Sequence, residues 1–127
     1  MVKLSVLSWN VQGINDAKKR CSCLSTLKRK TVDVALLQET HILQQDICKL
    51  ENGDFKVAAH SSANNRTKGV VILIRSNLKV NVIKQGKDPE GRIAYVKIAI
   101  NNKIAFISVN APVHMAVFFS YLCSIIN

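Results

Sequence analysis

The sequence lacks any apolar segment long enough to cross a lipid bilayer as a helix. Its most apolar stretch, residues 113–126, is shorter than the roughly 20 residues that such a helix needs. The start of the chain is interrupted by Ser5, Ser8 and Asn10, so it has no continuous apolar core of a signal peptide. We therefore expect an intracellular protein without a membrane span.

The four cysteines lack the spacing of a zinc site. Cys21 and Cys23 form one close pair, but Cys48 and Cys123 do not supply the second pair that structural zinc sites use. Because disulfides are rare inside cells, we expect reduced thiols that are mostly buried. The sequence also has no internal repeat, linker or low-complexity segment, and its 127 residues suffice for one domain or most of one.

Acidic residues are few. The 8 Asp and Glu stand against 18 Lys and Arg, which gives a formal net charge of +10. This balance favours a polyanionic partner, either nucleic acid or an anionic membrane surface, and does not choose between them. Hydrophobic residues make up 48% of the sequence, so we expect a folded core and not a disordered chain.

The first forty residues predict a strand, a helix and a second strand. Residues 2–9 are rich in Val and Leu and run into a turn, which is typical of a strand. A helix is predicted next because Ala17, Cys21, Leu24 and Leu27 recur at helical spacing. Residues 32–37 form an almost unbroken apolar run, as in strands that are buried on both faces. Strands joined in this way are parallel in a right-handed connection in nearly all known cases.

Two polar residues follow these strands, Asn10 after the first and Glu39 after the second. Functional groups in open α/β sheets collect at the carboxyl ends of the strands, so the parallel pair predicts Asn10 and Glu39 at one edge. A carboxylate placed there can hold Mg²⁺ through a hard oxygen. The alternatives are a solvated loop glutamate and a turn-forming asparagine.

Most of the remaining sequence predicts strands. We expect a short helix over residues 44–50 and strands over residues 57–59, 69–74 and 78–83. After a turn at residues 88–91, Ala94, Val96, Ile98 and Ile100 alternate as one buried face. Asn101 and Asn102 supply a hairpin turn, and residues 103–109 form the returning strand.

Basic and histidine side chains outside these elements are weaker candidates. Arg66 and Lys68 lie in a polar loop before a strand, where they would contact nucleic-acid phosphates or simply be solvated. His41, His60 and His114 are scattered, so a structural or exposed role is favoured over metal ligation.

Four segments of the sequence resemble the endonuclease/exonuclease/phosphatase superfamily. They are residues 7–13 (LSWNVQG), 37–41 (LQETH), 68–73 (KGVVIL) and 88–92 (DPEGR). Within the superfamily, the chain looks most like the N-terminal part of an apurinic-type endonuclease domain of LINE-type retrotransposons. The resemblance covers residue 3 to about residue 112.

This resemblance implies part of a four-layer α/β sandwich, in which two facing mixed sheets are flanked by helices. It also implies a nuclease that uses Mg²⁺ or Mn²⁺ to hydrolyse phosphodiester bonds of DNA. Asn10 matches the asparagine that helps to arrange the metal and phosphate site, and Glu39 matches the glutamate that ligates the metal. We accordingly expect a monomer whose partner is DNA and not a membrane, in the nucleus rather than the cytoplasm.

Two departures from the family pattern bear on activity. Asn110 replaces the tyrosine that would face the phosphate, and we group Asn110 with Arg66 and Lys68 as nucleic-acid-binding positions. The later Asp-x-Asn motif and the Ser-Asp-His motif with the catalytic histidine are absent. We therefore expect a truncated, inactive endonuclease domain in residues 1–112 and an unrelated apolar tail in residues 113–127. The alternatives are a non-catalytic remnant that binds nucleic acid or a partner, and a phosphoesterase of the same superfamily with another substrate.

A missing half would also affect folding. The alternating apolar face of residues 94–100 would then have no second sheet to cover it, and exposed apolar patches of that size drive aggregation. We therefore expect the isolated chain to fold poorly.

Overall fold

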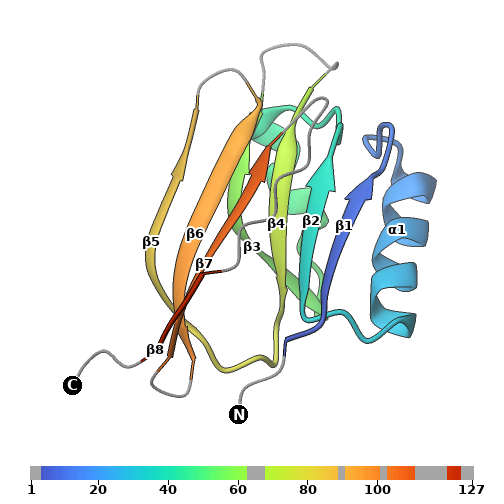
Figure 1. Cartoon of the computed structure of the whole chain (residues 1–127). Helices are drawn as coiled ribbons and strands as arrows, with labels where there is room; N and C mark the ends of the chain where they lie inside the picture. Colours follow the sequence, from blue (N-terminus) through green and yellow to red (C-terminus); the bar gives the residue numbers. More distant parts are fainter. Residues whose placement is uncertain (1–3, 63–67, 89–90, 101–102, 111–119, 124–127) are drawn as a thin grey trace.

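Two four-stranded β-sheets pack face to face, and a helix lies against the outer face of the first sheet (Figure 1). The computed structural model describes residues 4–62, 68–88, 91–100, 103–110 and 120–123. These layers confirm the predicted α/β fold class of two facing sheets with flanking helical segments.

The strands of the first sheet have the order β1 (Val6–Asn10), β2 (Val34–Gln38), β4 (Val70–Arg75) and β3 (Phe55–Ser61). The second sheet has the order β5 (Asn81–Lys87), β6 (Ile93–Ile100), β7 (Lys103–Asn110) and β8 (Ser120–Cys123). Helix α1 (Ala17–Arg29) connects β1 to β2, and the 3-10 helix η1 (Gln44–Leu50) lies between β2 and β3 in the sequence.

The first sheet is mixed because β1 and β2 run parallel while β2–β4 and β4–β3 are antiparallel pairs. The predicted strand, helix and strand at the start of the chain are therefore confirmed, and so is their parallel pairing. In the second sheet all three pairs of described strands are antiparallel, including the predicted β6–β7 hairpin, so this sheet is not mixed as predicted.

Helix α1 turns Cys23, Leu24 and Leu27 toward the first sheet, where all three are buried. Leu24 and Leu27 belong to the apolar stripe that the helical spacing predicts, whereas Cys21 of that stripe is exposed and the buried Cys23 is not part of it. Among the described residues, no helix combines the length and hydropathy needed to cross a membrane.

The strand predicted over residues 78–83 starts later than predicted, at Asn81. The amide of Leu78 donates a hydrogen bond to the Arg75 carbonyl in a turn, and strand pairing begins only at Asn81 and continues to Lys87. Leu78 and Val80 pack against the core without pairing. These two residues are apolar because they pack against the core, and the apolar pattern alone wrongly predicted a strand there.

The predicted boundary at residue 112 falls just after β7. Residues 111–119 lie outside the described part of the chain, and β8 pairs with β7 beyond them. Whether residues 113–127 are unrelated to the domain stays a prediction.

The inner face of the second sheet is covered. The predicted cause of poor folding, an uncovered apolar face at residues 94–100, is therefore wrong. Ala94, Val96 and Ile98 are completely buried, and they pack against inward-facing residues of the first sheet such as Leu36 and Ile72. A second apolar layer lies between the first sheet and the helices, so β2 is buried along its whole length. The first sheet itself supplies the partner that we expected to be missing.

Truncation of Ile98 tests this packing. Ile98→Ala should lower the free energy of unfolding by about 2–5 kcal/mol, because it leaves a cavity between the two sheets. Ile83→Ala is the matched control, since Ile83 on neighbouring β5 is 51% exposed and should change stability by less than about 0.5 kcal/mol. Urea denaturation followed by circular dichroism measures both, and equal losses would contradict the two-sheet core.

Candidate functional site

Two polar side chains meet where the parallel strands β1 and β2 end. Asn10 is the last residue of β1 and pairs in register with Gln38, the last residue of β2, and Glu39 follows directly. The Asn10 side-chain amide donates a hydrogen bond from Nδ2 to Glu39 Oε2 over 2.5 Å. The structure thus brings together the two residues that the sequence places at one edge.

The Asn10 amide is fixed from both sides. Its Oδ1 accepts a hydrogen bond from the backbone amide of Gln12 at 3.1 Å, so the chain beyond β1 folds back in an Asx-type turn. With the oxygen engaged there, the Nδ2 group faces Glu39. Asn10 therefore acts on the carboxylate of Glu39 as a donor, and it holds one of the two carboxylate oxygens in place.

The other carboxylate oxygen faces a histidine. His41 Nε2 lies 4.0 Å from Glu39 Oε1, and the two side chains are 28% and 35% exposed. Sequence reasoning gave His41 no role, although its place two residues after Glu39 was the available signal. The Glu39 side chain is thus partly exposed, so a cation or a water molecule can reach its carboxylate.

The backbone around the site adopts left-handed conformations. Gln12, Glu39 and His41 have φ angles of 52°, 52° and 59°, which non-glycine residues rarely adopt outside functional sites and special turns. Hydrogen bonds hold this backbone. The amide of Gly13 donates to the Glu39 carbonyl at 2.7 Å, and the amide of Ile14 donates to the Thr40 carbonyl at 2.9 Å.

The loop before β4 supports the same segment from its other side. The amides of Thr40 and His41 donate to the carbonyls of Gly69 and Lys68, at 3.1 Å and 3.0 Å. Gly69 has a φ of +127°, and a Cβ atom there would lie 2.5 Å from Thr40 Oγ1. A glycine is therefore required at this position for both conformation and space.

The predicted nucleic-acid-binding residues are only partly placed by the structure. Lys68 is exposed and adjoins the site through its backbone carbonyl. Asn110 ends β7, where its backbone pairs with Ile93, and its side chain is outside the described part of the structure. Arg66 and His114 lie outside the described residues.

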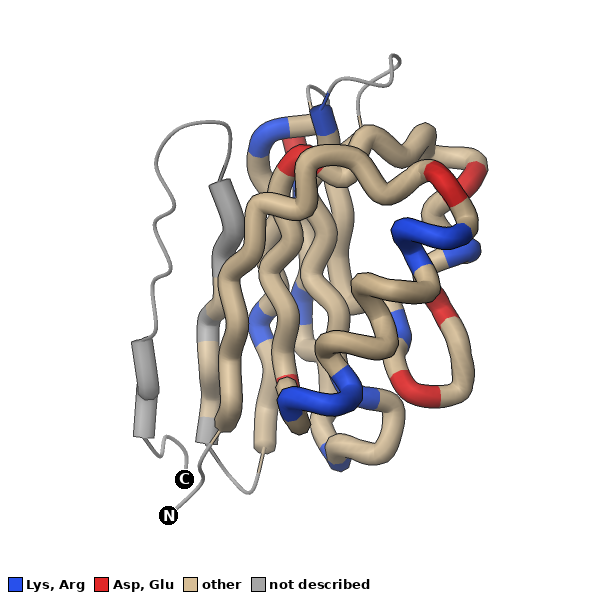
Figure 2. Tube along the Cα trace, turned by 90° about the vertical axis from the view of Figure 1, so that its right-hand side faces the viewer, with Lys and Arg blue, Asp and Glu red and all other residues tan. Residues whose placement is uncertain are grey.

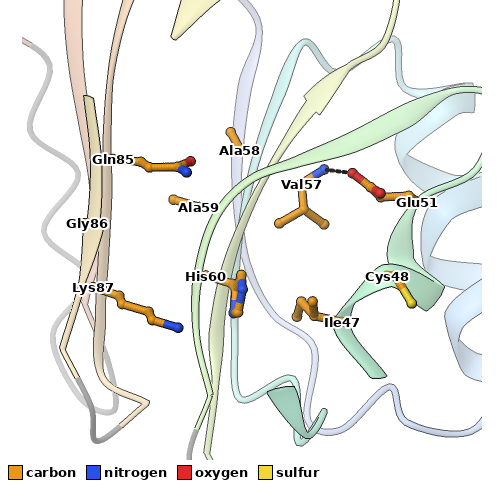
Figure 3. Close-up of a pocket in the computed structure, with 10 residues that line it drawn as sticks. All are labelled: Ile47, Cys48, Glu51, Val57, Ala58, Ala59, His60, Gln85, Gly86 and Lys87. Atoms are coloured by element: carbon orange, nitrogen blue, oxygen red, sulfur yellow. Dashed lines mark hydrogen bonds between the residues drawn. The ribbon is translucent and has the colours of Figure 1, made fainter. Parts of the chain in front are cut away.

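His60 lies apart from the site, in a pocket of about 510 Å³ between η1 and β5 (Figure 3). Burial, and secondly the charge of Lys87, hold the pKa of His60 below its usual value. Neither Asn10 nor Glu39 lines this pocket. A smaller hollow of about 240 Å³ adjoins the site on the side of α1, and Trp9, Gln12, Gly13 and Lys19 are among its lining residues.

The thiols and the acidic groups define what the site can bind. Burial raises the pKa of Cys23 to about 11, so this thiol stays protonated, and the described Cys21, Cys23 and Cys48 are free. Within the described ranges, no three His, Cys, Asp or Glu side chains gather as a metal cluster. The site therefore offers one carboxylate with hard oxygens, which suits a cation that completes its shell with water or phosphate oxygens.

Comparison with known proteins gives the class of the chain. A model of the endonuclease/exonuclease/phosphatase family matches residues 7–122, which include the segments around Asn10 and Glu39. The chain belongs to the endonuclease/exonuclease/phosphatase family.

Several solved structures share the fold. The AP endonuclease LMAP from Leishmania major matches with a TM-score of 0.64 at 17% identity, over 82% of this chain and 38% of that chain. D. rerio TDP2 in complex with a single-strand DNA product matches with a TM-score of 0.59 at 18% identity, over 86% and 47%. A humanized D. rerio TDP2 with 14 mutations matches with a TM-score of 0.58 at 18% identity, over 86% and 51%. The chain thus spans about half or less of the length of these proteins.

Glycine substitutions test the support of the site. Gly69→Ala should lower the free energy of unfolding by about 1–3 kcal/mol or more, because the new Cβ meets Thr40 Oγ1 in a left-handed backbone conformation. Gly53→Ala is the control, since nothing lies within 4 Å of its Cβ position. Urea denaturation should show little change for that variant, and an equal loss at both glycines would contradict the close approach.

Proposed function

We propose that this chain is part of a divalent-metal-dependent endonuclease domain that hydrolyses phosphodiester bonds of DNA. We assign it to the apurinic type that LINE-type retrotransposons carry. The contact between Asn10 Nδ2 and Glu39 Oε2 at the ends of two parallel strands carries the proposal. Support comes from the family, whose enzymes generally use divalent metal ions, and from the fold shared with an AP endonuclease.

The residues present fit Mg²⁺ or Mn²⁺ as a single-carboxylate site. Glu39 would hold the ion through its partly open carboxylate, since Mg²⁺ commonly takes only one or two protein carboxylates and keeps several waters. When bound, the ion would stabilise charge on the phosphoryl oxygens and lower the pKa of a bound water. Asn10 orients Glu39, because its oxygen is engaged by the Gln12 amide.

DNA is the proposed partner because the chain carries a net charge of +10 and because Lys68 adjoins the Glu39 loop. Arg66, Lys68 and Asn110 would contact phosphates. Among the described residues, Lys and Arg lie on the helix, in loops and on strands of both sheets, and not along one stripe (Figure 2). The charge therefore attracts a polyanion in general, and the site sets where the DNA strand lies. Each phosphate neutralised adds about −0.9 to the slope of log K for binding against log salt concentration.

Hydrolysis also requires an acid–base group and an oriented water. In the family these tasks fall to residues of motifs that this sequence lacks, so we propose that the chain binds metal and DNA without turnover. Asn110 in place of the family tyrosine, together with the missing motifs, favours a non-catalytic remnant that binds nucleic acid or a partner as the second candidate function. Metal binding at Glu39 separates the two candidates.

A titration with Mn²⁺ tests the metal site. Glu39→Gln removes the charge at unchanged size, and we expect it to weaken Mn²⁺ binding more than about 10-fold, since the loss of an outer-shell partner alone costs about 10–100-fold. Glu51→Gln is the matched control, because Glu51 accepts a hydrogen bond from the Val57 amide away from the site. The paramagnetic resonance signal of free Mn²⁺ measures both affinities. Equal affinities of the two variants would contradict the assignment.

Nicking of supercoiled plasmid tests the reaction. The purified chain should not nick with Mg²⁺ or Mn²⁺, because loss of one acid–base group alone costs about 10²- to 10⁴-fold in rate. A chimera of residues 1–112 with the second half of a related complete domain should nick. In this chimera Glu39→Ala should abolish nicking, and Asn110→Tyr should raise it. Nicking by the purified chain that Glu39→Ala stops would show a working enzyme, and a chimera indifferent to Glu39→Ala would exclude the metal role.

A further inference from the structure

A buried hydrogen-bonded junction joins the two sheets near the site. Ser61, the last residue of β3 in the first sheet, is fully buried. Its Oγ lies 2.5 Å from the carbonyl oxygen and 2.7 Å from Oδ1 of Asp88, the residue after β5 in the second sheet. The single hydroxyl proton is donated to Asp88, and the same Oγ accepts a hydrogen bond from the Gly91 amide at 3.0 Å.

Asp88 shapes the turn that carries Gly91. Its Oδ1 accepts hydrogen bonds from the amides of Arg92 and Ile93, at 3.0 Å and 2.9 Å. Its own amide donates to the Ile93 carbonyl at 3.0 Å. The turn between β5 and β6 is thus closed by one carboxylate and tied to β3 by one serine. Gly91 has no freedom to move away from β3 while these bonds persist.

A chain of backbone hydrogen bonds leads from Gly91 to the Glu39 loop. The Gly69 amide donates to the Gly91 carbonyl at 3.2 Å, and the Gly69 carbonyl accepts from the Thr40 amide at 3.1 Å. Thr40 lies between Glu39 and His41, both of which hold left-handed conformations. The junction is therefore connected by two backbone hydrogen bonds to the segment that sets the direction of the Glu39 carboxylate.

We propose that Ser61 and Asp88 are positioning residues for the Glu39 site, through Gly91, Gly69 and Thr40. This inference rests on the proposed function. Strained backbone persists only where its surroundings over-determine it, and here the second sheet supplies part of that constraint. Without the junction, Gly91 loses its tie to β3, and the Gly69 and Thr40 backbone is free to relax toward ordinary conformations that turn Glu39 away from Asn10.

Two basic side chains lie next to the junction. Figure 3 shows His60 on β3 and Lys87 on β5, each one residue before its junction partner, with the Lys87 side chain extended toward β3. Burial, and secondly the charge of Lys87, hold the pKa of His60 below its usual value. Beside these two side chains the Ser61–Asp88 hydrogen bond links β3 to the end of β5.

Adjacent serines provide a matched pair of variants. Ser61→Ala removes a hydroxyl with partners in Asp88 and Gly91. Ser62→Ala removes a hydroxyl that is buried without a hydrogen-bond partner among the described residues. Asp88→Ala removes the Oδ1 acceptor of Ser61, Arg92 and Ile93 and leaves the backbone carbonyl, whereas Asp88→Asn keeps an oxygen in the same place. This last variant tests the geometry even if Ser61→Ala does not fold.

The experiment has two measurements. In the Mn²⁺ titration, Ser61→Ala and Asp88→Ala should weaken binding about 10-fold, while Ser62→Ala and Asp88→Asn should match the unchanged chain. By NMR, the amide protons of Gly69 and Thr40 should exchange about 3- to 10-fold faster in the first two variants, as expected for loss of one net hydrogen bond. The amide of Arg75, which donates to Asp33 at the far end of β4, should not change.

The outcomes separate this inference from the proposed function. If the unchanged chain does not bind Mn²⁺, the proposed metal site fails, and the exchange rates alone decide whether the junction holds the loop. If Mn²⁺ binds and depends on Glu39, but Ser61→Ala behaves like Ser62→Ala in both measurements, the positioning role is overturned. Faster exchange at Gly69 and Thr40 with rescue by Asp88→Asn supports it.

Discussion

The parallel pairing of β1 with β2 is the constraint on which the candidate site depends. Because Val6 pairs with Val34 and Asn10 with Gln38, the two strands end together, and the residues beyond them are delivered to one edge. A slip of one residue would turn every side chain of β1 to the opposite face of the sheet. Asn10 would then no longer reach Glu39. The register of one strand pair thus decides whether the site exists.

An ion pair fixes the same register at the other end of the sheet. Arg75 donates from Nε and Nη2 to Asp33 Oδ1, at 2.9 Å and 2.6 Å, and the Ser5 amide donates to Asp33 Oδ2 at 2.9 Å. Asp33 thereby ties the start of β1 to the start of β2 and to the end of β4. The apolar residues of β2 and β4 between these two ends are buried on both faces, so the strands are held at both ends and along their length.

The sequence predicts the local parts of this arrangement and misses the connections between distant parts. Asn10 and Glu39 are predictable because each follows an apolar strand, and the handedness of the crossover then places them together. Ser61 and Asp88 owe their contact to the packing of one sheet on the other, which no periodicity predicts. The only sequence signal for His41 is its place two residues after Glu39. The left-handed conformations of Gln12 and Glu39 are equally hidden, since neither residue type predicts them.

Thr31 shows what such a conformation means when no site is involved. Its φ of 53° terminates α1, at a position where glycine is the commonest residue. Gln12, Glu39 and His41 share this geometry, and each non-glycine residue held there costs on the order of 1–3 kcal/mol. Selection for stability alone would replace Gln12 and His41 by glycine or asparagine. The fold thus carries this strain beside the ends of β1 and β2, next to Asn10 and Glu39, where it lowers stability instead of adding to it.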